Sequence, residues 1–191
     1  MITAVDGLPY DCFAIAPCST ATGGVVVLAS NAMLFVDQSG RRVALPVNGW
    51  PPRVSDLPMP QLPEQDKTRD LQLEGSRFAF VDETRFFVFL KDGTVYPVEL
   101  VQDGKTVSRL SIGAALARTT IPAVVKRIPG EHVFVGSTVG PSVLLKTVRV
   151  EEEIQNEDVE MEGPAAVVDM EQDDLMDDEG EWSPGFIYSL A

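Results

Sequence analysis

The sequence predicts an all-β fold, a partial β-propeller of about two and a half to three antiparallel blades. Short runs rich in Val, Leu and Phe alternate with Gly- and Asp-containing turns from residue 24 to residue 150. Asp92-Gly93 is a strong hairpin signal, and Gly140, in a second small-residue turn, follows Gly93 by 47 residues, close to the length of one blade. Propellers usually close with about four to eight blades, so we expect the chain to be a fragment or truncated product of a longer propeller.

Charge divides the 191 residues into two unequal parts. Residues 1–150 contain 15 Lys/Arg and 14 Asp/Glu, whereas residues 151–191 contain 15 Asp/Glu and neither Lys nor Arg. A block of like charge repels itself and stays solvated. We therefore expect a partial propeller over 1–150, an acidic disordered insertion over 151–181, and over 182–191 the returning, truncated strand of the last blade.

The first third of the chain predicts one small sheet followed by a loop. Residues 1–22, with Pro9 and Pro17, are interpreted as an irregular connection that enters a sheet. A three-stranded meander then follows from the apolar runs at 24–30, 33–37 and 42–45. Six prolines between 46 and 69 exclude a central strand, and that stretch is expected to be an exposed loop.

The middle of the chain predicts strands joined by very short turns, at 71–74, 77–81, 85–90, 94–101 and 105–112. Such turns force antiparallel neighbours, so 77–112 is expected to form one four-stranded blade. Its packing against the next blade is assigned to Phe78, Phe80, Phe86, Phe87 and Phe89. Residues 113–120 are interpreted as a crossover to the next blade, with strands at 122–128, 133–135 and 143–150 and a fourth within 182–190.

The turn from Gly136 to Ser142 lies between two apolar runs. Its two glycines, Gly136 and Gly140, are expected to supply positive φ angles or a close backbone approach. A nucleophile elbow would need a helix after the serine, and a strand follows Ser137 instead. His132, the only histidine, is expected to be a surface or packing residue at a strand start, so no enzyme is predicted.

The remaining residues predict no cofactor and no metal. Cys12 and Cys18 lack the further ligands of a zinc site. A disulfide between them is possible but not needed, and two buried thiols in a reducing compartment are expected. The acidic pairs lack the spacing of a calcium loop, and no phosphate-binding glycine loop is present. Since no apolar run approaches ~20 residues and no basic leader is present, we expect a soluble intracellular protein without a membrane role.

Part of the chain resembles a known family. The residues Val133 to Ser137, then Gly140, Ser142 and Leu144-Leu145-Lys146, resemble a signature near the end of the first propeller in large β-propeller scaffold proteins. That family includes the largest subunit of the cleavage and polyadenylation specificity factor, the large subunit of the damaged-DNA-binding complex and a U2-associated splicing factor subunit. Leu-Leu-Lys, together with 8–11 and 23–27, favours the polyadenylation subunit. The chain departs from the pattern at Thr138 and Pro141.

The resemblance implies a non-catalytic nuclear scaffold in pre-mRNA 3′-end cleavage and polyadenylation. By resemblance, its partners are a WD-repeat subunit, a zinc-finger subunit and the endonuclease, and pre-mRNA is reached mainly through the complex. Two alternatives stay open: an adaptor of a cullin ubiquitin ligase, and a propeller that binds RNA directly. For the latter, Lys126 and Arg127 are the candidates for a weak RNA contact, because phosphate neutralisation carries such binding.

Overall fold

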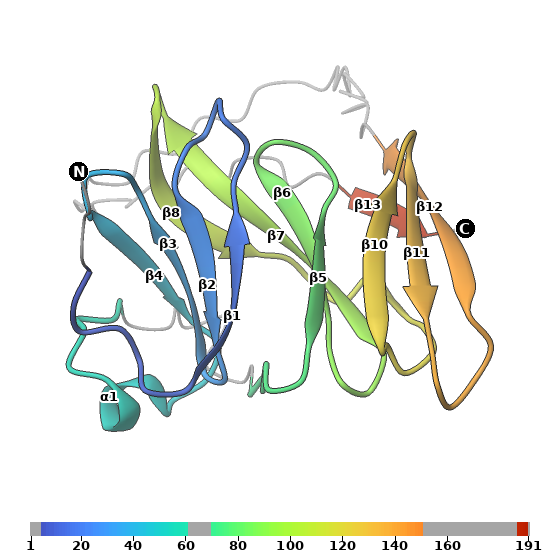
Figure 1. The fold of residues 1–191 in the computed structure, drawn as a ribbon, viewed down its shortest axis with the longest axis horizontal. Helices are drawn as coiled ribbons and strands as arrows, with labels where there is room; N and C mark the ends of the chain where they lie inside the picture. Colours follow the sequence, from blue (N-terminus) through green and yellow to red (C-terminus); the bar gives the residue numbers. More distant parts are fainter. Residues whose placement is uncertain (1–4, 61–69, 151–186, 191) are drawn as a thin grey trace, which may run out of the picture.

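The computed structural model describes residues 5–60, 70–150 and 187–190. In these ranges the backbone forms three antiparallel sheets, each containing four strands paired in chain order. The sheets lie side by side along the molecule (Figure 1), and the predicted all-β partial propeller is confirmed. The acidic residues 151–181 and residues 61–69 of the proline-rich loop lie outside the described residues.

The first sheet consists of β1 (Cys12–Pro17), β2 (Val25–Ala29), β3 (Ala32–Val36) and β4 (Arg42–Pro46). The interpretation of 1–22 as irregular was therefore wrong in its second half, and the meander has four strands instead of three. The prediction was wrong here because Pro17 argues against a strand. This residue ends β1, which pairs only with β2, and an edge strand tolerates a missing amide donor.

The second sheet consists of β5 (Arg77–Phe80), β6 (Arg85–Phe89), β7 (Thr94–Asp103) and β8 (Thr106–Ile112). This is the four-stranded blade predicted over 77–112. A two-residue strand within the expected crossover, β9 (Ala117–Arg118), pairs with the start of β7. The crossover is thus anchored to the sheet that it leaves.

The strand predicted at 71–74 is not present. Leu71 N donates to the carbonyl of Val47 at 3.1 Å, and Leu73 N donates to the carbonyl of Ser30 at 2.8 Å. These two acceptors lie on separate segments at one end of the first sheet, in the β2–β3 turn and just after β4, so no ladder forms. The alternation of apolar and polar residues that suggested a strand instead places two leucine side chains, Leu71 and Leu73, in buried positions.

The third sheet consists of β10 (Val124–Ile128), β11 (His132–Gly136), β12 (Val143–Val150) and β13 (Ile187–Leu190). β13 pairs antiparallel with β12 in a register that places Leu190 opposite Thr147. The chain therefore contributes a distant segment as the fourth strand of this sheet.

Two apolar cores fill the spaces between neighbouring sheets, and strand alternation assigns residues to them. On β6, Phe86 and Val88 join the core shared with the first sheet, whereas Phe87 and Phe89 join the core shared with the third sheet. All four are at most 1% exposed. Each such side chain contributes about 1.5–3 kcal/mol by its removal from water, so β6 stabilises both interfaces.

The phenylalanines that sequence analysis assigned to this packing contribute unequally. Phe78 and Phe80 are only partly buried and lie at the margin of the core between the first and second sheets. Phe80 packs on Phe86 with ring centroids 5.1 Å apart. The far face of the first sheet is covered differently, by side chains from outside the sheets: Val5, Leu8, Leu57 and Met59.

The loop after the first sheet begins with one helical turn, α1 (Pro51–Val54). Proline is favoured at the first helical position because its missing amide donor would be unpaired there in any case. Trp50, expected in a loop, is half exposed, and the Arg53 guanidinium lies 4.7 Å from its ring centroid. The helix is far too short to change the fold class.

The turns that join the first and second strands of each sheet lie at one end of the molecule, the upper end in Figure 1. A hydrogen bond connects two of them, because Thr22 Oγ1 donates to the carbonyl of Glu83 at 3.0 Å. Between the second and third sheets, Arg77 Nε donates to the carbonyl of Ala123 at 2.9 Å. The sheets are thus tied by polar contacts as well as by apolar cores.

Candidate functional site

The turn between β11 and β12, which carries most of the family signature, is held together by its own serines. Ser137 Oγ accepts hydrogen bonds from the amides of Val139 and Gly140, at 3.3 and 3.2 Å. Ser142 Oγ accepts from the amide of Ser137 at 3.3 Å. Serine hydroxyls commonly organise turns in this way, and the arrangement gives both serines a structural use.

The two glycines of this turn are required for space and not for backbone conformation. Neither Gly136 nor Gly140 has a positive φ, so that part of the expectation was wrong. A Cβ atom at Gly136 would lie 2.6 Å from Val124 Cγ1, and one at Gly140 would lie 2.9 Å from Thr120 Oγ1. The close approach at both glycines is made by side chains, Val124 on the neighbouring strand and Thr120 in the crossover, and not by backbone as expected.

The signature residues Leu144, Leu145 and Lys146 alternate between the two faces of the third sheet. Leu145 packs against the core between the second and third sheets, whereas Leu144 is 56% exposed. Lys146 is exposed and, by alternation, shares the outer face with Leu144. The signature thus combines one partly buried leucine with an exposed leucine–lysine pair.

Lys126 and Arg127, the candidate RNA contacts, lie on opposite faces of β10. Lys126 pairs with Phe134, and Phe134 pairs with Leu144, so these side chains form one row on the outer face. Arg127 pairs with Val133, which is 1% exposed and faces the second sheet. The two neighbours therefore do not form one basic patch, because successive strand residues point in opposite directions.

His132 and Ser137 are too far apart to act as a base and a nucleophile. They are five residues apart along β11, and at about 3.3 Å per residue this separation exceeds 15 Å. A nucleophile and its base must be within hydrogen-bond reach. The side chain of His132 is half-buried at the start of the strand, as sequence analysis expected for a strand-end residue.

The two cysteines are free thiols with weak nucleophilic character. Burial raises the pKa of the Cys18 thiol to about 11. Burial, followed by the negative charge of Asp11, also raises the pKa of the Cys12 thiol, although Cys12 is exposed and not buried as expected. Because the thiolate is the reactive form, both groups are poor nucleophiles.

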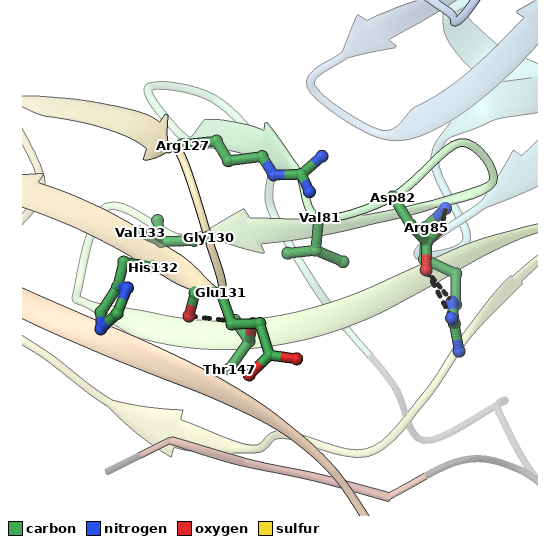
Figure 2. Close-up of a pocket in the computed structure, with 9 residues that line it drawn as sticks. All are labelled: Val81, Asp82, Arg85, Arg127, Gly130, Glu131, His132, Val133 and Thr147. Carbon is green, nitrogen blue, oxygen red and sulfur yellow. Dashed lines mark hydrogen bonds and ion pairs between the residues drawn. The ribbon is translucent and has the colours of Figure 1, made fainter.

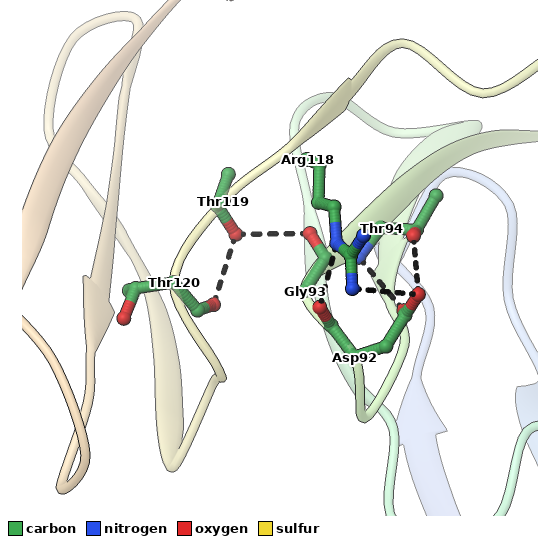
Figure 3. A network of polar contacts seen from close by, with 6 residues as sticks. All are labelled: Asp92, Gly93, Thr94, Arg118, Thr119 and Thr120. Atoms are coloured by element: carbon green, nitrogen blue, oxygen red, sulfur yellow. Dashed lines mark hydrogen bonds and ion pairs between the residues drawn. The ribbon is translucent and has the colours of Figure 1, made fainter.

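Figure 3 shows how the β6–β7 turn is joined to the crossover. Thr94 donates to the Asp92 carboxylate through its amide at 3.0 Å and its hydroxyl at 2.8 Å. Thr119 donates to the carbonyl of Gly93 through its amide at 2.8 Å and its hydroxyl at 3.1 Å. The next residue, Thr120, lies against Gly140, so the β6–β7 turn, the crossover and the β11–β12 turn form one continuous structure.

At the opposite end of the same two sheets a cleft opens between the β5–β6 and β10–β11 turns (Figure 2). Its volume is about 210 Å³. It is lined by Val81, Asp82, Arg85, Arg127, Gly130, Glu131, His132, Val133 and Thr147. Sequence analysis missed this cleft, because its two turns are about 50 residues apart and neither contains a recognisable motif.

Asp82 and Arg85 form a hydrogen-bonded ion pair at the cleft. Asp82 accepts hydrogen bonds from the amides of Thr84 and Arg85, at 3.0 and 2.8 Å, and forms an ion pair with the Arg85 guanidinium. Burial by itself raises the pKa of Asp82, but the hydrogen bonds and charge of Arg85 outweigh it, and the net pKa lies below the ordinary value. The carboxylate therefore stays ionised and fixes the β5–β6 turn.

The described ranges contain neither a cluster of metal-ligating side chains nor a helix that could span a membrane. Among these residues, no group of three or more His, Cys, Asp or Glu side chains is arranged to hold a metal ion. Over the same ranges, no helix has the length and apolar character needed to cross a bilayer.

Comparison with known proteins gives a consistent set of relatives. The chain is 31% identical, over 93% of its length, to Protein cft1 of Schizosaccharomyces pombe, and 29% identical, over 83%, to Protein CFT1 of Yarrowia lipolytica. It is 29% identical, over 76%, to cleavage and polyadenylation specificity factor subunit 1 of Drosophila melanogaster. The chain spans only 13%, 13% and 10% of the lengths of these three proteins. No family model matches the chain.

Proposed function

Because this chain belongs to the family of cleavage and polyadenylation specificity factor subunit 1, we propose that it acts in pre-mRNA 3′-end processing as a scaffold. The observation that carries the proposal is the 31% identity to Protein cft1 over 93% of the chain. In this role the chain docks the subunits that recognise the polyadenylation signal and holds them near the endonuclease. Such a role places the protein in the nucleus.

The architecture supports positioning as the mechanism. Two buried cores and a set of inter-sheet hydrogen bonds hold the three sheets in a fixed relation. Rigid elements present loops and turns to partners with little loss of conformational entropy on binding. The turns at both ends of the second and third sheets are the surfaces that this framework presents.

The side-chain chemistry supports a non-catalytic role. Ser137 and Ser142 use their hydroxyls to organise a turn, and the pKa of each cysteine thiol is raised. His132 is distant from the serine that sequence analysis considered. We therefore propose that the chain contributes surface and no catalytic group.

The opposite orientations of Lys126 and Arg127 support indirect contact with RNA. Single-strand binding usually combines a continuous basic groove with aromatic stacking platforms. These two side chains point away from each other, which favours contact with pre-mRNA through other subunits. RNA affinity of the isolated chain is accordingly proposed to be weak and to fall steeply with salt.

The test is to express the tagged chain in its own cells and to identify the proteins that co-purify. Recovery of the WD-repeat, zinc-finger and endonuclease subunits of the polyadenylation factor is expected. The matched control is the chain carrying Gly93→Val, which keeps the length, net charge and tag but disrupts the β6–β7 turn. Recovery of cullin ligase subunits instead, or of no polyadenylation subunit by a folded wild-type chain, would contradict the proposal.

A further inference from the structure

The cleft between the second and third sheets has an apolar floor. Val133 is 1% exposed and Val81 is half-buried, and both contribute to the core that joins the two sheets. Engineered apolar cavities of ~150 Å³ accept a benzene molecule, and this cleft is larger, at about 210 Å³. It therefore has room for one aliphatic side chain of another polypeptide.

The charged side chains at the rim of the cleft differ in whether they have an ion-pair partner. Asp82 and Arg85 neutralise each other, as described above. Arg127 is exposed and forms no side-chain hydrogen bond or ion pair with any residue that the structure describes. Figure 2 shows its guanidinium extending over the cleft, above Val81. An unpaired guanidinium beside an apolar floor is suited to bidentate binding of a carboxylate.

Other charges at the rim make a phosphate backbone an unfavourable occupant. A nucleic-acid strand carries a negative charge at every nucleotide, and the carboxylates of Glu131 and Asp82, which both line the cleft, would repel the phosphates that Arg127 does not bind. A short peptide brings a single carboxylate, which can pair with Arg127 alone. Among the residues that the structure describes, no Phe, Tyr or Trp side chain lines it, so these residues offer a nucleobase no aromatic platform. A peptide with an acidic side chain next to an aliphatic one matches both the apolar floor and Arg127.

We propose that this cleft is a docking site for an extended acidic-aliphatic peptide segment of a partner protein. The aliphatic side chain occupies the space over Val81 and Val133, and the Asp or Glu carboxylate pairs with Arg127. This inference rests on the proposed scaffold function and gives it a specific surface. Because the cleft lies at the end of the sheets and not on a sheet face, packing of a further sheet against β10–β13 would leave it open.

The test is selection from a displayed library of random twelve-residue peptides on the purified full chain. We expect enriched peptides to carry Leu, Ile or Val within two positions of Asp or Glu. The Arg127→Glu variant should bind the best peptide at least tenfold more weakly. Replacement of the peptide's acid by Lys should restore binding to that variant, since a charge swap restores only a direct contact.

Lys126→Glu is the matched control, because it makes the same charge change on the adjacent residue but on the opposite face of β10. It should leave peptide binding within twofold of the wild type. The inference would be overturned by enriched peptides without an acid, by equal losses in both variants, or by absence of rescue. Binding of a twelve-nucleotide single-stranded RNA that is lost selectively in Arg127→Glu would also overturn it.

The peptide measurement fails or succeeds independently of the scaffold proposal. If the tagged wild-type chain and Arg127→Glu recover the polyadenylation subunits equally while no peptide binds, the cleft inference is wrong and the scaffold function stands. If peptides bind as expected but the chain recovers no polyadenylation subunit, the scaffold function is wrong and the cleft remains a peptide site.

Discussion

The amide of Thr119 donates a 2.8 Å hydrogen bond to the carbonyl of Gly93, and this contact leaves no room for a side chain at Gly93. A Cβ atom there would collide with the carbonyl oxygen of Thr119. Gly93 also has φ +90°, a conformation that residues other than glycine rarely adopt. The turn that sequence analysis identified most easily is thus also the point at which the crossover is attached.

Substitution of Gly93 by alanine should lower the free energy of unfolding by about 2–4 kcal/mol, because backbone strain and a backbone collision act together. Gly104→Ala is the matched control, since Gly104 also has a positive φ, +60°, but open space around it. Its cost should be about 1 kcal/mol. Urea unfolding followed by circular dichroism measures both, and equal losses would show that the contact with Thr119 is unimportant.

Replacement of Phe87 by alanine should destabilise the interface between the second and third sheets by about 3–5 kcal/mol. Phe87 is 1% exposed within that core. Because total stability is only about 5–15 kcal/mol, Phe87→Leu provides a milder change that should still unfold at lower urea concentration. Leu144→Ala, at a 56% exposed position, should have an effect below about 1 kcal/mol. A larger effect at Leu144 than at Phe87 would reverse the assignment of the two faces.

Local turn chemistry explains which strands could be predicted from the sequence. The second sheet was predicted almost completely, because two of its three turns are Asp-Gly, a pair that specifies a hairpin within a few residues. β1 was missed because Pro17 looks unfavourable for a strand unless the strand is known to be an edge. The strand expected at 71–74 was wrong because Leu71 and Leu73 alternate as in a sheet, while their amides bond to two different segments.

The functional surfaces were less predictable than the sheets. Lys126 and Arg127 attract attention as a basic pair, but strand alternation separates them, and this could have been anticipated from the period of two residues. The cleft at Arg127 had no signal in the sequence, since Val81 and Val133 meet only after two sheets have packed. Among the described residues, Arg127 is the unpaired positive charge at this cleft only because Asp82 and Arg85 neutralise each other, and those two residues belong to a different blade.

Removal of the Ser137 hydroxyl should loosen the β11–β12 turn without unfolding the protein. In Ser137→Ala, the amides of Val139 and Gly140 lose their acceptor. Because water can partly replace it in an exposed turn, we expect a loss of about 0.5–1.5 kcal/mol and faster amide exchange at both positions. Thr138→Ala, at an exposed neighbouring residue, is the control and should leave exchange unchanged. Unchanged exchange in Ser137→Ala would contradict the structural role of the serine.

The Asp82 carboxylate should stabilise the fold at neutral pH and lose this contribution in acid. Its pKa is lowered in the folded state despite burial, through hydrogen bonds from Arg85 and Thr84. For a depressed pKa, stabilisation is present above the unfolded value, about 3.9 for aspartate, and disappears as pH falls through the folded value. Asp82→Asn should therefore be less stable than the wild type by about 1 kcal/mol at pH 7.

This difference between Asp82→Asn and the wild type should shrink as pH falls below about 4, because the wild-type carboxylate is then protonated and also uncharged. Urea midpoints measured for both proteins between pH 7 and pH 2.5 test this. Glu83→Gln removes a negative charge from the exposed adjacent residue and controls for the change in net charge. A difference that stays constant across this range would mean that ionisation of the Asp82 carboxylate does not stabilise the β5–β6 turn.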